Sequence, residues 1–203
     1  MKLLVDTDAF CKLGITGLLP DAVRILGADL PECGRLPALP HMLRRGSLPR
    51  RYGTETCAAL IPLAEAMPVL QQPGTAWLDT LASIEAVDPG EAQLFAAAAE
   101  FGLMVVSGDK RALRAMKNVK GLSDALAGRV SVLEAILLGL CERLGPEDLR
   151  RRVAPLAPFD KTVEVCFSPG SSDPREGLRS YYRSLVVEVE PLVLWDPQMG
   201  DGT

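Results

Sequence analysis

Short apolar runs alternate with amphipathic stretches over roughly the first 145 residues of the chain. Lys2 to Val5 and Leu103 to Ser107 have the composition of buried strands, and Ile84 to Val87 and Arg129 to Val132 are candidates for two more. Strands that alternate with helices favour a parallel sheet covered on both faces. The pattern therefore predicts an α/β protein with a three-layer α/β/α arrangement around a central parallel sheet.

Helical patterns fill the intervals between these runs. The strongest is EAQLFAAAAEF, which opens at Asp88-Pro89-Gly90-Glu91 and is closed by Gly102 as a left-handed C-cap. Ser131 is placed to cap the helix VLEAILLGLCERL, which ends at Gly145-Pro146. Further helices are expected over residues 20–26, 36–45 and 54–66 and in the segment KRALRAM.

The pattern changes after Pro158. Thr162 to Phe167 alternates in polarity, Arg175 to Leu185 is helical, and Val186 to Trp195 resembles a strand. These features predict a small C-terminal β-α-β appendage. The chain is thus divided into a main domain over residues 1–145 and an accessory segment over 146–203, whose last residues, Gln198 to Thr203, are expected to be disordered.

Composition and charge narrow the class of protein. The 203 residues are 48% hydrophobic and 24% charged, which fits a globular protein with a sizeable core. A net charge of -4 excludes steering of nucleic acid by the global field and leaves only local basic clusters for that role. One cluster contains Arg44, Arg45, Arg50 and Arg51 and another Arg150 to Arg152, although a solvated surface is the commoner role of such groups.

Cysteine usage and hydropathy bear on location. The five cysteines are widely spaced and form no CxxC pair, so buried reduced thiols are expected instead of disulfides or a zinc ribbon. The N-terminus lacks a signal-peptide core. The longest apolar run, Val132 to Cys141, is interrupted by Glu134 and is too short to span a bilayer. These observations predict a cytoplasmic protein with no membrane contact.

Three acidic residues share one predicted context. Asp6 follows the first strand, Glu91 starts a helix, and Asp109 follows the strand LMVV. Because loops at the carboxyl ends of parallel strands converge on one crevice, these carboxylates are expected to lie close together. Crowded carboxylates need a cation, and Mg²⁺ or Mn²⁺ prefers such oxygen ligands. The single histidine, His41, disfavours zinc hydrolases and Ser-His-Asp enzymes.

Helix capping is the competing interpretation of the same residues. Asp88-Pro89-Gly90-Glu91 fits a capping box, and Asp109 fits the N-cap of the helix that follows it. Asp6 is harder to explain in this way, because a carboxylate directly after a buried strand costs free energy unless it is paired or bound to metal.

The segments VDTDAF, DPGEAQLFAAAAEFG and VVSGDKRAL resemble PIN-domain nucleases, and the resemblance covers about residues 1–145. It implies a metal-dependent endoribonuclease that binds Mg²⁺ or Mn²⁺ through Asp6, Glu91 and Asp109, with Ser107 and Asp8 in support. It also implies a toxin of a toxin–antitoxin pair, with an RNA substrate, an antitoxin partner and a homodimer as expected contacts. The family usually has one more acid, for which Glu32 is the best candidate and Glu55 the next.

The basic residues are interpreted in the light of that resemblance. Lys110 follows Asp109 and is expected to meet a phosphate near the metal. The four arginines of the first cluster, Arg44, Arg45, Arg50 and Arg51, are expected to follow an RNA backbone without reading its sequence.

Two alternatives remain open. Asp6-Thr7-Asp8 resembles the Asp-x-Asp pair of haloacid-dehalogenase-like phosphatases, but Leu113 stands where that family has an acid. The second alternative is a catalytically inactive PIN-like module that binds RNA or protein and whose acids only cap helices.

Overall fold

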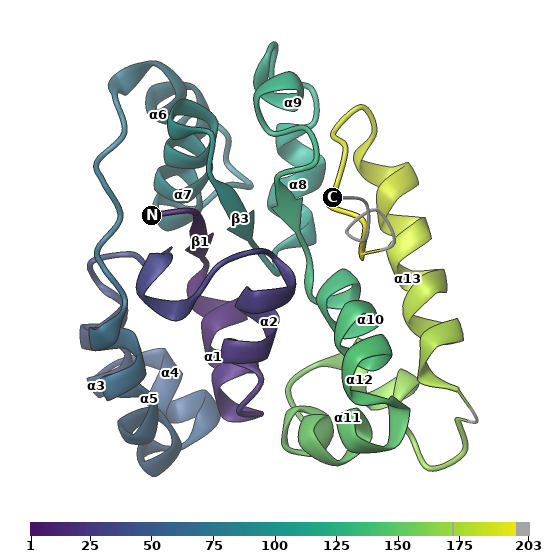
Figure 1. The fold of residues 1–203 in the computed structure, drawn as a ribbon. Helices are drawn as coiled ribbons and strands as arrows, with labels where there is room; N and C mark the ends of the chain where they lie inside the picture. Colours follow the sequence, from purple (N-terminus) through teal and green to yellow (C-terminus); the bar gives the residue numbers. More distant parts are fainter. Residues whose placement is uncertain (172, 198–203) are drawn as a thin grey trace.

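A computed structural model of the chain describes residues 1–171 and 173–197, and its centre is a four-stranded, all-parallel sheet (Figure 1). Its strand order is β2-β1-β3-β4. In register, Leu4 of β1 lies opposite Gly34 of β2 and Val105 of β3, and Val105 lies opposite Val130 of β4. The predicted parallel sheet is therefore confirmed. Its strands are β1 (Leu3–Val5), β2 (Cys33–Gly34), β3 (Met104–Val106) and β4 (Val130–Ser131).

The strands are short and almost completely buried. Leu3, Leu4 and Val5 are at most 1% exposed, as expected for the central strand of a covered parallel sheet. The predicted strand over Ile84 to Val87 is wrong. These residues form turns, in which the Ile84 N–H donates to Leu81 O and the Val87 N–H donates to Ile84 O. They connect α6 (Thr75–Ala82) to α7 (Pro89–Phe101).

Helices cover the sheet on two faces. The connection from β1 to β2 runs in the opposite direction across the sheet from those that lead to β3 and β4. Because crossovers between parallel strands are right-handed, the helices of opposite crossovers lie on opposite faces. The α/β fold is consistent with three layers. The helices before the C-terminal segment are α1 (Thr7–Ile15), α2 (Leu19–Ile25), α3 (Leu39–Arg44), α4 (Ser47–Tyr52), α5 (Thr54–Ala66), α8 (Lys110–Met116), α9 (Leu122–Ala125) and α10 (Leu133–Leu144).

The predicted C-cap at Gly102 is confirmed, whereas the predicted N-cap at Ser131 is wrong. Gly102 ends α7 with φ of 64°, the left-handed conformation that favours glycine. Ser131 does not cap α10 as predicted: the N-cap is Val132, which makes no side-chain cap. Ser131 is instead paired in β4, and its hydroxyl is buried without a hydrogen-bond partner among the described residues.

The C-terminal segment is helical, so the predicted β-α-β appendage is wrong. It contains α11 (Pro146–Val153), α12 (Lys161–Cys166) and α13 (Pro174–Val189). The run from Thr162 to Phe167 forms a helix because Asp160 caps it, accepting from the Val163 N–H at 3.1 Å, and because Val163 and Cys166 fall on one buried helical face. The first residues of the run from Val186 to Trp195 continue α13. Near its end the run meets β4 through an isolated parallel bridge between Leu194 and Val130.

The C-terminal helices share one hydrophobic core with the α/β part. Leu178, Leu185 and Val189 of α13 belong to the same buried cluster as the strands, and α13 runs beside α10 (Figure 1). The prediction of disorder for Gln198 to Thr203 concerns residues outside those described. The five cysteines are all buried and form no disulfide bond. Among the described helices, none is long and apolar enough to cross a membrane.

Candidate functional site

The predicted acidic residues lie around one cavity at the carboxyl edge of the sheet. Asp6 follows β1 directly, Asp109 comes three residues after the end of β3, and Glu91 lies in the first turn of α7. All three line a cavity of about 510 Å³, together with Asp8 and Asp88. Residues distant in sequence are thus gathered at the place that the parallel sheet predicts.

Asp6 is the most buried carboxylate on this cavity after Glu91. It is 9% exposed and caps α1, accepting hydrogen bonds from the backbone N–H groups of Thr7 at 2.7 Å and Asp8 at 3.3 Å. Burial raises the pKa of Asp6 to about 6, and repulsion by the Asp8 carboxylate adds to this effect, while the two N–H groups oppose it. Its capping bonds therefore compensate only part of the cost of burying this carboxylate.

Glu91 and Asp88 form the predicted capping box of α7. The Asp88 carboxylate accepts from the Glu91 N–H and the Glu91 carboxylate accepts from the Asp88 N–H, both at 2.8 Å. Burial raises the pKa of Glu91 to about 7, and repulsion by Asp109, Asp88 and Asp6 raises it further against the bond from the Asp88 N–H. The Glu91 carboxylate is therefore close enough to Asp6 and Asp109, which lie on other segments of the chain, to be repelled by both.

Asp109 has the capping role that its position also allows. Its Oδ1 accepts from the N–H groups of Arg111 at 2.8 Å and Ala112 at 3.0 Å, at the start of α8. Ser107, which is 1% exposed, accepts through Oγ from the Asp109 N–H at 3.3 Å. Ser107 therefore fixes the backbone that carries Asp109, which is a supporting position.

These carboxylates are caps, and they keep oxygen atoms for another ligand. Among the residues described, Glu91 Oε1 accepts no hydrogen bond, and Asp109 Oδ2 has only the Arg111 guanidinium, at 3.7 Å. A carboxylate has about four lone-pair positions, so capping and metal binding are compatible. The donor type suits Mg²⁺ or Mn²⁺. As the side chains stand, no group of three His, Cys, Asp or Glu within the described residues is arranged to hold one metal ion.

Asp8 lies on the same cavity in a different electrostatic setting. Its carboxylate pairs with Lys12 at 2.8 Å and Arg51 at 3.3 Å, and it accepts from the Tyr52 hydroxyl at 3.1 Å. A Cβ added at Gly108 would stand 3.0 Å from Asp8 Oδ2, so glycine leaves room for this carboxylate beside the loop after β3. Asp8 is therefore surrounded by donors and positive charge.

The C-terminal segment contributes to this cluster. Lys12 also pairs with Asp160 at 2.8 Å, and both side chains are 11% exposed. Burial alone would raise the pKa of Asp160, but the hydrogen bond and charge of Lys12 bring it below its usual value. Arg51 donates to Phe159 O at 3.3 Å, and the rings of Tyr52 and Phe159 meet edge to face with centroids 4.9 Å apart. Sequence reasoning missed Lys12 and Asp160.

A second buried pair holds Lys110, which lines the cavity. Lys110 Nζ pairs with Glu134 of α10, whose side chain is 4% exposed and also accepts from the Thr162 hydroxyl at 3.2 Å. Tyr181 lies over the same ammonium, with its ring centre 5.8 Å away. The sequence offers a signal for Glu134, because it is the single acid in the apolar run from Val132 to Cys141 and a buried acid needs a partner.

Several predicted residues lie elsewhere. Glu32 precedes β2, so it stands at the opposite edge of the parallel sheet, where it pairs with Lys2 at 2.9 Å. Glu55 is an exposed residue in the first turn of α5. Of the basic residues proposed to bind RNA, Arg51 and Lys110 line the cavity, whereas three do not: Arg44 pairs with Glu65, Arg50 donates to Gly46 O, and Arg45 ends α3.

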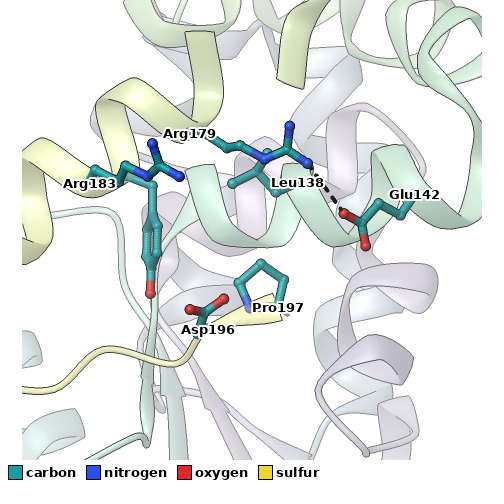
Figure 2. A pocket seen from close by; sticks show the side chains of 7 residues that line it. Leu138, Glu142, Arg179, Arg183, Asp196 and Pro197 are labelled. Atoms are coloured by element: carbon teal, nitrogen blue, oxygen red, sulfur yellow. Dashed lines mark ion pairs between the residues drawn. The ribbon is translucent and has the colours of Figure 1, made fainter. Parts of the chain in front are cut away.

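A separate small cavity lies between α10 and α13 (Figure 2). Leu138 and Glu142 of α10 face Arg179 of α13 there, and Arg179 pairs with Glu142 at 3.7 Å. Asp196 and Pro197 close it from below in the view of Figure 2. With a volume of about 80 Å³ and none of the predicted acids in its lining, it is a smaller feature than the acidic cavity.

The protein thus has an α/β fold with a parallel sheet, and carboxylates line a cavity at the carboxyl edge of that sheet. Comparisons with protein-family models, with curated proteins and with solved structures gave no match.

Proposed function

We propose that the protein is a PIN-like, metal-dependent endoribonuclease. One observation carries the proposal: Asp6, Glu91 and Asp109, from three separate segments, line a single cavity at the carboxyl edge of a parallel sheet. Asp6 and Glu91 are buried there and have raised pKa values, so a divalent cation would relieve a cost that the protein otherwise carries. The RNA substrate, an antitoxin partner and a homodimer belong to the same proposal.

Each residue has a role in this proposal. Asp6, Glu91 and Asp109 would hold Mg²⁺ or Mn²⁺, and the bound ion would supply a polarised water and stabilise charge on a displaced phosphate. Lys110 and Arg51, the cations of the cavity, bind the phosphodiester. Glu134 orients Lys110, and the Ser107 hydroxyl holds the backbone N–H of Asp109.

The phosphatase alternative is less well supported by the surroundings of Asp8. That mechanism needs Asp8 to deliver a proton to a leaving group. Lys12, Arg51 and the Tyr52 hydroxyl all donate to or pair with its carboxylate, so its oxygen atoms are already engaged by protein donors and do not face a leaving group alone. This arrangement suits a residue that organises positive charge beside the cavity.

The test is cleavage of a fluorophore-labelled RNA by the purified protein with Mg²⁺ or Mn²⁺. The wild type is expected to cleave, to lose activity with chelator, and to lose it in Asp6→Asn and Asp109→Asn. Asp79→Asn is a matched control, because Asp79 is exposed on α6 and outside the cavity lining.

Two other results would overturn the proposal. Hydrolysis of a phosphomonoester with an aspartyl-phosphate trapped on Asp6 would identify a phosphatase. RNA binding that persists with chelator and in Asp6→Asn, without any turnover, would identify a binding module.

A further inference from the structure

A second hollow adjoins the acidic cavity and differs from it in chemistry. It has a volume of about 400 Å³, within the range of roughly 300–1,000 Å³ typical of small-molecule sites. Asp6, Thr7, Met42 and Asp88 line both spaces, so the two are adjacent. The hollow is therefore next to any ligand bound at the acids.

The walls of the hollow are mostly apolar. They come from the segment after β2, from α3 and from the start of α7, and they present Leu36, Pro37, Ala38, Met42 and Pro89. The acids lie at the end that is shared with the acidic cavity. Away from that end, the chemistry suits a flat, weakly polar group and not a phosphate.

Gln93 is the uncharged polar side chain of α7 on this hollow. It is half-buried one turn after Pro89, and within the described part of the chain its amide makes no hydrogen bond. A glutamine amide offers two N–H donors and one carbonyl acceptor. It is thus free to pair with a group that has both donors and acceptors on one edge.

We propose that the hollow binds one nucleobase of the RNA, next to the phosphate held at the acidic cavity, and that Gln93 pairs with the edge of that base. This inference rests on the proposed nuclease function. A nucleobase has an apolar face and a hydrogen-bonding edge, and proteins bind single-stranded bases by packing on the face and pairing with the edge. The apolar walls and the Gln93 amide match these two parts.

The first experiment maps where the protein cuts a pool of RNA of random sequence, by sequencing the new ends. We expect wild type to prefer one base beside the cut. Gln93→Leu should reduce the ratio of preferred to other cuts about tenfold, because the amide that pairs with the base edge is lost. Gln72→Leu is the matched control, because Gln72 is exposed and outside both linings. An unchanged ratio in Gln93→Leu, with cleavage intact, overturns the inference.

The second experiment does not depend on cleavage. Ribonucleoside 5′-monophosphates and ribose 5-phosphate are titrated into the protein with Mg²⁺ and followed by NMR. Ala38→Trp, which adds bulk at an exposed position of the wall, is expected to weaken nucleotide binding several-fold and to leave ribose 5-phosphate unaffected. Equal binding of nucleotides and ribose 5-phosphate to wild type overturns the base site.

The two proposals fail in distinguishable ways. Base-dependent nucleotide binding that Ala38→Trp weakens, without RNA cleavage under any condition, sustains the base site and rejects the nuclease. RNA cleavage with a cut profile insensitive to Gln93→Leu sustains the nuclease and rejects the base site.

Discussion

Two groups of carboxylates lie near each other in this molecule under opposite electrostatic conditions. Asp6 and Glu91 have backbone N–H groups as their hydrogen-bond partners, and burial raises the pKa of both. Asp8, Asp160 and Glu134 are paired with Lys12, Arg51 or Lys110. The difference teaches that buried acids alone do not mark a metal site. What singles out Asp6 and Glu91 is that their hydrogen-bond partners are uncharged backbone N–H groups, although Arg51 and Lys110 also line the cavity.

The largest expected effect on stability comes from breaking the paired group at Lys12. Lys12→Met leaves Asp8 with fewer donors and Asp160 buried without its partner. Removing one member of a buried ion pair typically costs about 3–5 kcal/mol, so urea denaturation should show a loss of that order. Lys161→Met is the control, because its pair with Glu164 is exposed and is worth at most about 1 kcal/mol. Equal losses in the two variants would contradict the comparison.

The acidic group should make the metal-free protein less stable as pH rises. The Asp6 pKa is about 6 in the folded state, above its ordinary value of 3.8. The folded state thus holds a proton that the unfolded chain has already lost, and this stabilisation, present below about pH 4, is lost as pH rises through 6. The full shift corresponds to roughly 3 kcal/mol.

Denaturation of wild type between pH 4 and 8 measures this loss, and Glu91 should extend it toward pH 7. Asp6→Asn, which cannot ionise, is expected to flatten the Asp6 part of the profile. A wild-type stability that does not change over this pH range would contradict the raised pKa values of Asp6 and Glu91.

Divalent metal should stabilise the folded protein by neutralising the acids of the cavity. Mg²⁺ or Mn²⁺ at one hundred times its dissociation constant is expected to stabilise the wild type by about 2.7 kcal/mol, seen as a rise in Tm at neutral pH. Asp109→Asn should show a much smaller rise, while Asp79→Asn should behave as wild type. A metal-induced rise that survives in Asp109→Asn would place the binding site elsewhere.

The smallest expected effect separates the two kinds of surface arginine. Arg51→Gln should lower RNA affinity and reduce the slope of log affinity against log salt by about 1, because this cation lines the cavity. Arg44→Gln should change the slope less, since Arg44 pairs with Glu65 outside the cavity, and each variant should cost less than about 1 kcal/mol of stability. Equal salt slopes in the two variants would indicate that the whole arginine cluster binds RNA.

The sequence was informative where local pattern and global fold agree. LLV and LMVV could be assigned as strands because each is a short apolar run beside turn residues, and Asp88 with Glu91 could be assigned as a capping box from spacing alone. Val186 to Trp195 misled because its β-branched residues suit a strand or a buried helical face. Packing against α10, distant in sequence, favours the helix there.

For the site, the rule that parallel strands converge at their carboxyl ends gathered Asp6 and Asp109 correctly around one cavity. The same rule could not predict the ion pairs that surround these acids. Lys12 and Asp160 are separated by 148 positions, and no pattern in the chain indicates their pairing. Glu32 was chosen for its order along the chain, but its place before β2 puts it at the other edge of the sheet.

The pairing of Asp160 with Lys12 has a consequence for any shortened form of the chain. A version that ends at Leu144 would strip one counter-ion from a buried ammonium, remove the Thr162 hydroxyl from Glu134, and bare the side of α10 that α13 covers. We expect such a fragment to aggregate instead of forming a minimal nuclease. The C-terminal segment thus supports the residues beside the acidic cavity, through the ion pair of Asp160 with Lys12 and the hydrogen bond of Thr162 to Glu134.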